Sequence, residues 1–208
     1  AKDPSGTTGD DEEEFRWIWV EFDGCDFSQR GGDEYFDEED FFSHDDIHDL
    51  FSAISHRALN LSLLDSASIL CGFLCVSDRD DFEGHTLQID QTEGLNDVGY
   101  AKLGDMIRRS VQLRELSLHL AFIDGAHELF GGLANAIGLQ ELSLADALRK
   151  PNAWPSHRFL HDLGDVVVGD HNGNGPIMQL LKNPQNQLKK LSLSQMGLKD
   201  HHLIAILE

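Results

Sequence analysis

The sequence predicts an α/β fold in which short strands alternate with helices. The first observation is a leucine pattern, L-x-x-L-x-L, which is clearest at residues 113–118, 139–144 and 188–193. Its last three positions alternate apolar and polar residues, as in a strand with one buried face. The second observation is that apolar residues after each copy recur at intervals of three and four, as on the buried side of a helix. The third is a nearly constant distance between copies.

Looser copies extend the pattern to most of the chain. The apolar residue at the middle of each copy is Ile18, Leu61, Leu87, Leu116, Leu142, Val166 and Leu191. Successive differences are 43, 26, 29, 26, 24 and 25 residues, which is one strand and one helix per repeat after the first. This register predicts strands around Ile18 and Val20 and over residues 163–168.

Helices are expected between the strands. Residues 45–55 and 67–75 carry apolar residues at helical spacing, and Asp97 is a suitable N-cap for a helix that contains Tyr100, Leu103 and Ile107. Further helices are predicted from Ala126, around residues 158–163, and after Asp200.

In period and leucine spacing, residues 56–208 resemble leucine-rich repeats of the ribonuclease-inhibitor type. The resemblance implies a solenoid of about seven units, with a curved parallel sheet on the concave side and helices on the convex side. Residues 15–55 are then an N-terminal cap with an acidic insertion, and residues 1–14 an acidic tail. Since the last helix ends on apolar residues, we expect the solenoid to continue or a partner to cover it. The chain departs from the family three positions after each strand pair, where Asn or Cys is usual: Ser66, Thr92, Ala121, Ala147, His171 and Met196.

The charge is strongly negative and unevenly distributed. The formal net charge is −21 at pH 7, which argues against binding nucleic-acid phosphates or an anionic membrane surface. Residues 1–49 hold 18 acidic and 3 basic side chains, a balance of −15, so the other residues contribute −6. A basic partner fits this segment, although a solvated acidic loop has the same composition. Its clustered carboxylates are Glu12, Glu13, Glu14, Asp33, Glu34, Asp37, Glu38, Glu39 and Asp40.

The three cysteines are too few for a disulfide framework, which points to a reducing compartment, cytoplasmic or nuclear. No apolar run reaches the length of a membrane span. The aromatic run of residues 15–22, with Trp17, Trp19 and Phe22, is expected to close the end of the core; a binding patch is the alternative.

Few residues suggest chemistry. His44 and His48 have the i, i+4 spacing of a metal-binding pair, but a third ligand must come from elsewhere, so they are weak candidates. Residues 170–177 match the opening of a calcium loop but lack the closing carboxylate, which favours a glycine-rich turn. We therefore expect no cofactor and no enzymatic activity.

Strand residues between the buried leucines are expected to line the concave face, which is the usual binding surface of the family that the chain resembles. They are Gln88, Asp90, Glu115, Ser117, His119, Glu141, Ser143, Asp146, Lys190 and Ser192. The leading hypothesis is a non-enzymatic protein-interaction scaffold or subunit of a larger eukaryotic assembly, which binds a basic partner through this face and the acidic segment. The alternatives are a histone-chaperone-like acidic leucine-rich-repeat protein and a metal-binding protein or metalloenzyme at His44 and His48.

Overall fold

A computed structural model describes residues 19–23, 44–64, 70, 73–74, 82–90, 95–120, 126–146, 163–169 and 173–207, with residues 44–48 as backbone alone. The predicted acidic tail and all nine clustered carboxylates of the acidic segment lie outside these ranges.

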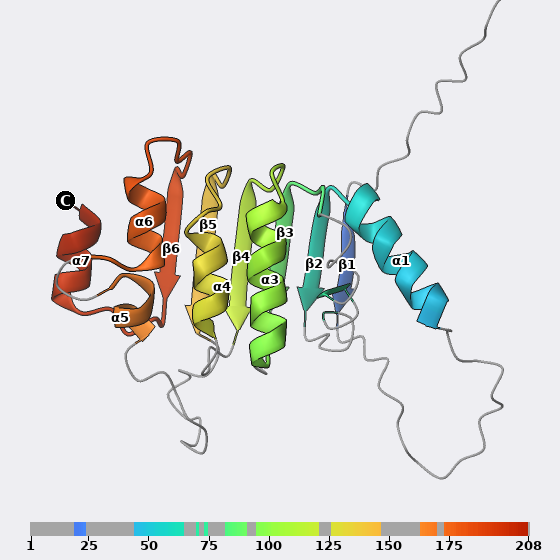
Figure 1. Ribbon diagram of the computed structural model, residues 1–208, viewed down its shortest axis with the longest axis horizontal. Coiled ribbons are helices and arrows are strands. Elements are labelled where there is room, and N and C mark those ends of the chain that lie inside the picture. Colours follow the sequence, from blue (N-terminus) through green and yellow to red (C-terminus); the bar gives the residue numbers. More distant parts are fainter. Residues whose placement is uncertain are drawn as a thin grey trace, which may run out of the picture.

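The strands form one six-stranded parallel sheet whose spatial order follows the chain (Figure 1). Neighbouring parallel strands need a crossover between them, and helices supply it here. The described helices lie on one side of the sheet (Figure 1). The predicted α/β class is therefore confirmed. The strands are β1 Val20–Asp23, β2 Asn60–Leu64, β3 Thr86–Asp90, β4 Glu115–Leu120, β5 Glu141–Asp146 and β6 Lys190–Ser194.

The helices are α1 His44–Arg57, α3 Asp97–Arg109, α4 Ala126–Leu133, α5 Leu163–Val167, α6 Pro176–Lys182 and α7 Asp200–Leu207. The N-cap of α3 is Asn96 and not Asp97, because the Gly99 N–H donates to Asn96 Oδ1 at 2.8 Å. Within the described residues, no helix combines the length and the apolar character that crossing a membrane requires.

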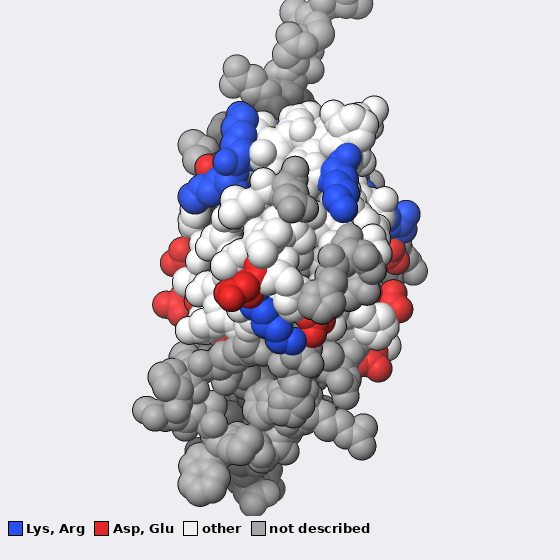
Figure 2. All heavy atoms as spheres, turned by 90° about the vertical axis from the view of Figure 1, so that its left-hand side faces the viewer, with Lys and Arg blue, Asp and Glu red and all other residues white. Residues whose placement is uncertain are grey.

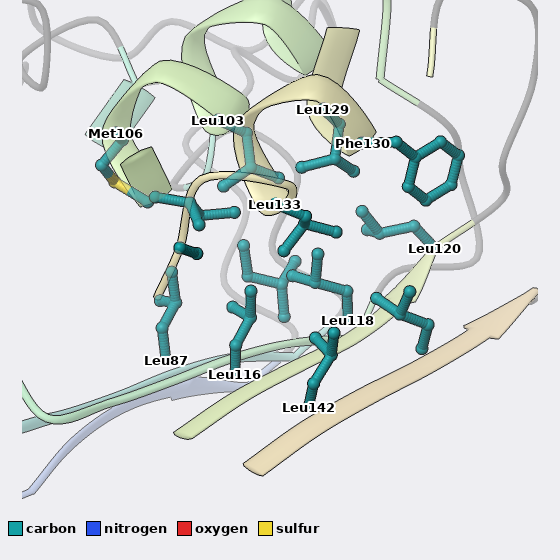
Figure 3. Packing of buried hydrophobic residues seen from close by; sticks show 14 of the residues in the cluster. Leu87, Leu103, Met106, Leu116, Leu118, Leu120, Leu129, Phe130, Leu133 and Leu142 are labelled. Carbon is teal, nitrogen blue, oxygen red and sulfur yellow. The ribbon is translucent and has the colours of Figure 1, made fainter. Parts of the chain in front are cut away.

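The core lies between the sheet and the helices, as Figure 3 shows. Leucines from β3, β4 and β5 point towards apolar side chains of α3 and α4, and each side chain is at most 2% exposed. Burying one such side chain stabilises the fold by about 1.5–3 kcal/mol. The labelled residues are Leu87, Leu103, Met106, Leu116, Leu118, Leu120, Leu129, Phe130, Leu133 and Leu142.

Two glycines let α3 and α4 approach closely. A Cβ atom on Gly104 would lie 2.7 Å from the Glu128 carbonyl oxygen, and one on Gly132 would collide with the Gly104 backbone. Gly131, one residue earlier, faces open space. The first two positions therefore exclude any side chain, whereas the third does not.

The predicted strand over residues 163–168 is wrong, because Leu163–Val167 is helix α5. The buried residues there include Leu163, Gly164, Val167 and Val168, which is a helical spacing, and so short a segment does not distinguish this spacing from strand alternation in the sequence. β5 instead pairs directly with β6, with Leu142 opposite Leu191. The distance between these strands is thus 191 − 142 = 49 residues, and two described helices, α5 and α6, occupy the crossover.

The register of β1 also differs from the prediction. Val20 lies opposite Leu61 and Phe22 opposite Leu63, two residues later than the predicted pair of Ile18 and Val20. A shift of two residues keeps the same side chains on the core face, so the apolar pattern alone does not distinguish the two registers.

β6 and α7 form the C-terminal end of the row of elements, which Figure 2 shows face on. Leu191 and Leu193 are only partly buried, in contrast to the equivalent leucines of the inner strands. On α7, Leu203, Ile204 and Leu207 are 48%, 56% and 85% exposed. Much of this end is uncharged; Lys and Arg lie towards its upper part and also lower down, beside acidic side chains (Figure 2).

Candidate functional site

The candidate site is the sheet face turned away from the helices, which we call the open face. Alternate strand residues point to it, and the strand register aligns them into three rows that run across the strands. The first row is Asn60, Thr86, Glu115, Glu141 and Lys190. The serine row is Ser62, Gln88, Ser117, Ser143 and Ser192. The third row is Leu64, Asp90, His119, Ala145 and Ser194.

Nearly all the residues predicted for this face lie on it; Asp146 is the exception. Asp146 is 4% exposed and lies opposite Leu120 on the core side of the sheet. Strand alternation gives the open position to Ala145, so the prediction skipped one residue. Asp146 is therefore excluded from the candidate site.

β1 adds residues that the sequence analysis did not assign to the open face. Glu21 lies opposite Ser62, and Trp19 precedes β1 at the level of Asn60. The Trp19 side chain is 54% exposed, and its Nε1 donates to Glu21 Oε2 at 3.3 Å. Trp19 therefore does not close the core, whereas Phe22 packs partly against it. The predicted core-closing role is wrong for Trp19, and Trp17 lies outside the described ranges.

A shallow depression of about 530 Å³ runs across the open face. It extends from Trp19 to Lys190 and is lined mainly by side chains of the first row and the serine row. Its long direction therefore crosses the strands.

Carboxylates outnumber cations on this face. Strand alternation and register place five carboxylates there, those of Glu21, Asp23, Asp90, Glu115 and Glu141, and one lysine, Lys190. Asp90 Oδ1 pairs with His119 Nδ1 at 2.9 Å.

Lys190 forms an ion pair with an acidic residue of the first row. Its Nζ donates to Glu141 Oε2 at 2.8 Å. The hydrogen bond and charge of Glu141, together with the charge of Glu115, raise the pKa of Lys190, so its ammonium form is stabilised. Glu115 itself is exposed and forms no ion pair with a cation of the described ranges.

A second polar cluster joins α5 to α7. His202 is fully buried, and its Nε2 lies 2.7 Å from Asp165 Oδ1. Lys199 Nζ donates to Asp165 Oδ2 at 2.9 Å, and His201 Nε2 lies 3.5 Å from Oδ1. The hydrogen bond from Lys199, with smaller contributions from His202, lowers the pKa of Asp165 to about 2 against partial desolvation. The sequence analysis missed this cluster because Asp165 is 34 to 37 residues away from the other members.

Asp165, His201 and His202 could hold a metal ion by proximity alone, since their ligand atoms lie within 4.8 Å of one another. The hydrogen bonds argue otherwise. The backbone N–H of Lys199 donates to His202 Nδ1 at 3.0 Å, so in the neutral ring the proton is on Nε2, the atom that would bind the metal. This contact is the N3-to-N-cap bond of a capping box, with His202 in the place of Glu or Gln. The cluster is therefore a structural clasp that begins α7 and ties it to α5.

The other candidates are only partly described. His44 and His48 lie on the helical backbone of α1, but their side chains are outside the description. Of residues 170–177, which match the opening of a calcium loop but were expected to form a glycine-rich turn, residues 170–172 are also outside the description. The Gly173 carbonyl oxygen accepts a hydrogen bond from Lys182 Nζ at 3.1 Å, so one backbone oxygen of this segment faces a lysine ammonium group.

No protein-family model, no curated protein and no solved structure matches this chain. The geometry defines an α/β protein with an acidic sheet face that is accessible along its first row, whereas Ser62 of the serine row is 1% exposed.

Proposed function

We propose that this chain is a non-enzymatic leucine-rich-repeat interaction scaffold or subunit, which binds a basic protein partner through the open face and the acidic N-terminal segment. The solenoid interpretation is supported by the chain order of the strands and by the leucines at equivalent positions of β4, β5 and β6. The observation that carries the binding proposal is the accessible row from Trp19 to Lys190, which holds two carboxylates, Glu115 and Glu141, and one lysine.

The physical basis is a preformed and charged surface. Strand side chains on a sheet are held by the backbone ladder, so a partner that docks on them does not have to order a loop first. Excess carboxylates attract a basic surface over a distance of about a Debye length, which raises the association rate. The acidic residues of positions 1–49 add to this attraction by composition.

The proposal is tested by capture experiments at low and high salt. The bait is the whole chain, compared with an open-face variant, Glu115→Gln with Glu141→Gln, and with a helix-side variant, Asp105→Asn with Glu128→Gln. Both variants remove two carboxylates, so they match in net charge. We expect a basic protein on the wild-type and helix-side baits at low salt, reduced by the open-face variant and lost at high salt.

Equal retention by both variants, or retention that ignores salt, contradicts the proposal. If histones are the retained set, the histone-chaperone hypothesis becomes the better description. Stoichiometric zinc in the purified chain, lost on replacing His44 and His48 with alanine, favours the metal hypothesis instead.

A further inference from the structure

We propose that the open face recognises an extended peptide segment with two basic side chains separated by three residues. This inference rests on the proposed function, because it specifies the partner of the same face. It follows from the position of two sites for cations in the first row and from the geometry of parallel strands.

The first cation site is formed by Trp19 and Glu21. The indole is about half exposed, and its Nε1–H donates to the Glu21 carboxylate, which places the ring beside a negative charge. A guanidinium that stacks on an indole next to a carboxylate gains both cation–π and ionic attraction.

The second cation site is Glu115. Its neighbour on β5, Glu141, is already paired with Lys190, whereas Glu115 is exposed and has no ion-pair partner among the described cations. Lys190 is itself positively charged, so it repels a basic side chain of the peptide at the β6 end of the row. The basic side chains are therefore expected between β1 and β4.

The distance between the two sites sets the peptide spacing. Trp19 is level with Asn60, and the register continues from Asn60 through Thr86 to Glu115, which makes three strand intervals. At about 4.8 Å per interval, the two sites lie about 14 Å apart. An extended chain advances about 3.4 Å per residue and returns to the same side every second residue, so positions i and i+4 fit both the distance and the direction. Positions i and i+2 cover about 7 Å, which is too short to reach both sites.

Two labelled peptides of identical composition separate spacing from charge: Arg-Val-Thr-Val-Arg and Arg-Val-Arg-Val-Thr, each acetylated and amidated. Their binding to the whole chain is measured by fluorescence anisotropy at low salt. We expect the first peptide to bind about fivefold more tightly, as a second cation contact of about 1 kcal/mol implies.

The same titration on protein variants locates the two sites. Trp19→Ala and Glu115→Gln should each abolish the preference for the first peptide, and Glu128→Gln on α4 should preserve it. Circular dichroism and thermal unfolding check that each variant is folded.

Equal affinity for the two peptides overturns the spacing, and so does a preference that survives both open-face substitutions. The proposed function stands in those cases if the capture experiment succeeds. If neither peptide binds while a basic protein is captured, recognition of an extended segment is wrong although the open face still binds. Failure of both experiments rejects the function and the inference together.

Discussion

Lys190 on β6 donates to Glu141 on the adjacent β5 at 2.8 Å, and Glu115 on β4 continues the same row towards Trp19. The only lysine at an open-face strand position of the described sheet is thus occupied by one carboxylate, while the next carboxylate remains accessible. An exposed ion pair of this kind contributes little to stability, at most about 1 kcal/mol. Its main effect is to neutralise part of the negative charge that the open face presents to a partner.

Removing Lys190 should therefore strengthen binding of a basic ligand. We expect Lys190→Gln to tighten the binding of Arg-Val-Thr-Val-Arg by about two- to fivefold at low salt, because Glu141 is released and a repulsive charge is lost. Anisotropy titrations at two ionic strengths measure this, with Lys102→Gln on α3 as the control of equal charge change. Unchanged or weaker binding by Lys190→Gln argues against an electrostatic role for the first row.

The close contact of α3 and α4 should make Gly132 irreplaceable. Gly132→Ala is expected to lower the free energy of unfolding by about 1–3 kcal/mol, because the new methyl group collides with the Gly104 backbone and separates the helices. Gly131→Ala is the matched control. It should be neutral or stabilise the protein by up to about 1 kcal/mol, since its Cβ faces open space in a helix. Urea unfolding followed by circular dichroism measures both, and equal effects would refute the close approach.

The clasp between α5 and α7 predicts a cost for losing the buried imidazole. His202→Leu leaves the Lys199 N–H and the Asp165 carboxylate without their shared partner, so the free energy of unfolding should fall by about 1–3 kcal/mol. His202→Gln should cost less, because glutamine at N3 of a helix can accept the same backbone N–H. The same urea titrations compare them. A leucine variant as stable as the wild type would show that the clasp contributes nothing to stability.

Because the pKa of Asp165 is lowered in the folded protein, the free energy of unfolding should decrease at acidic pH. Its pKa in the folded protein is about 2, below the usual 3.8, so its ionised form favours the folded state. That contribution is complete above about pH 5 and is lost as the pH falls through 3.8 towards 2. The difference in urea midpoint between wild type and Asp165→Asn should shrink over this range. Asp105→Asn, which removes an exposed pair with Arg108, is the control. A difference that persists unchanged at the acid limit contradicts the assignment.

The leucine spacing predicted the sheet well where strand and helix patterns were both long. Leu116 and Leu142 lie opposite each other as expected, because a strand with one buried face has a fixed alternation. The strand predicted over residues 163–168 was wrong because so few apolar residues, Leu163 and the three valines that follow, fit a helix as well as a strand. The prediction for β1 was wrong only in its register, because a shift of two residues buries equally apolar side chains.

The candidate face followed from the same alternation, and its errors have local causes. Asp146 was misplaced by one residue, which moves a strand side chain to the opposite face. Trp19 and Glu21 were not assigned to the face because the aromatic run of residues 15–22 was expected to close the core, although either register of β1 points both side chains to the open face. Nothing local in the sequence brings Asp165 to His202, because a pair 37 residues apart meets only through tertiary packing.

The most direct test of the central claim is the affinity of the captured basic partner for three purified proteins, measured by calorimetry at low salt. They are the wild type, the open-face variant Glu115→Gln with Glu141→Gln, and the helix-side variant Asp105→Asn with Glu128→Gln. We expect the open-face variant to bind at least about fivefold more weakly than the wild type, and the helix-side variant to bind equally well. Equal weakening by both variants would show that net charge, and not the open face, holds the partner.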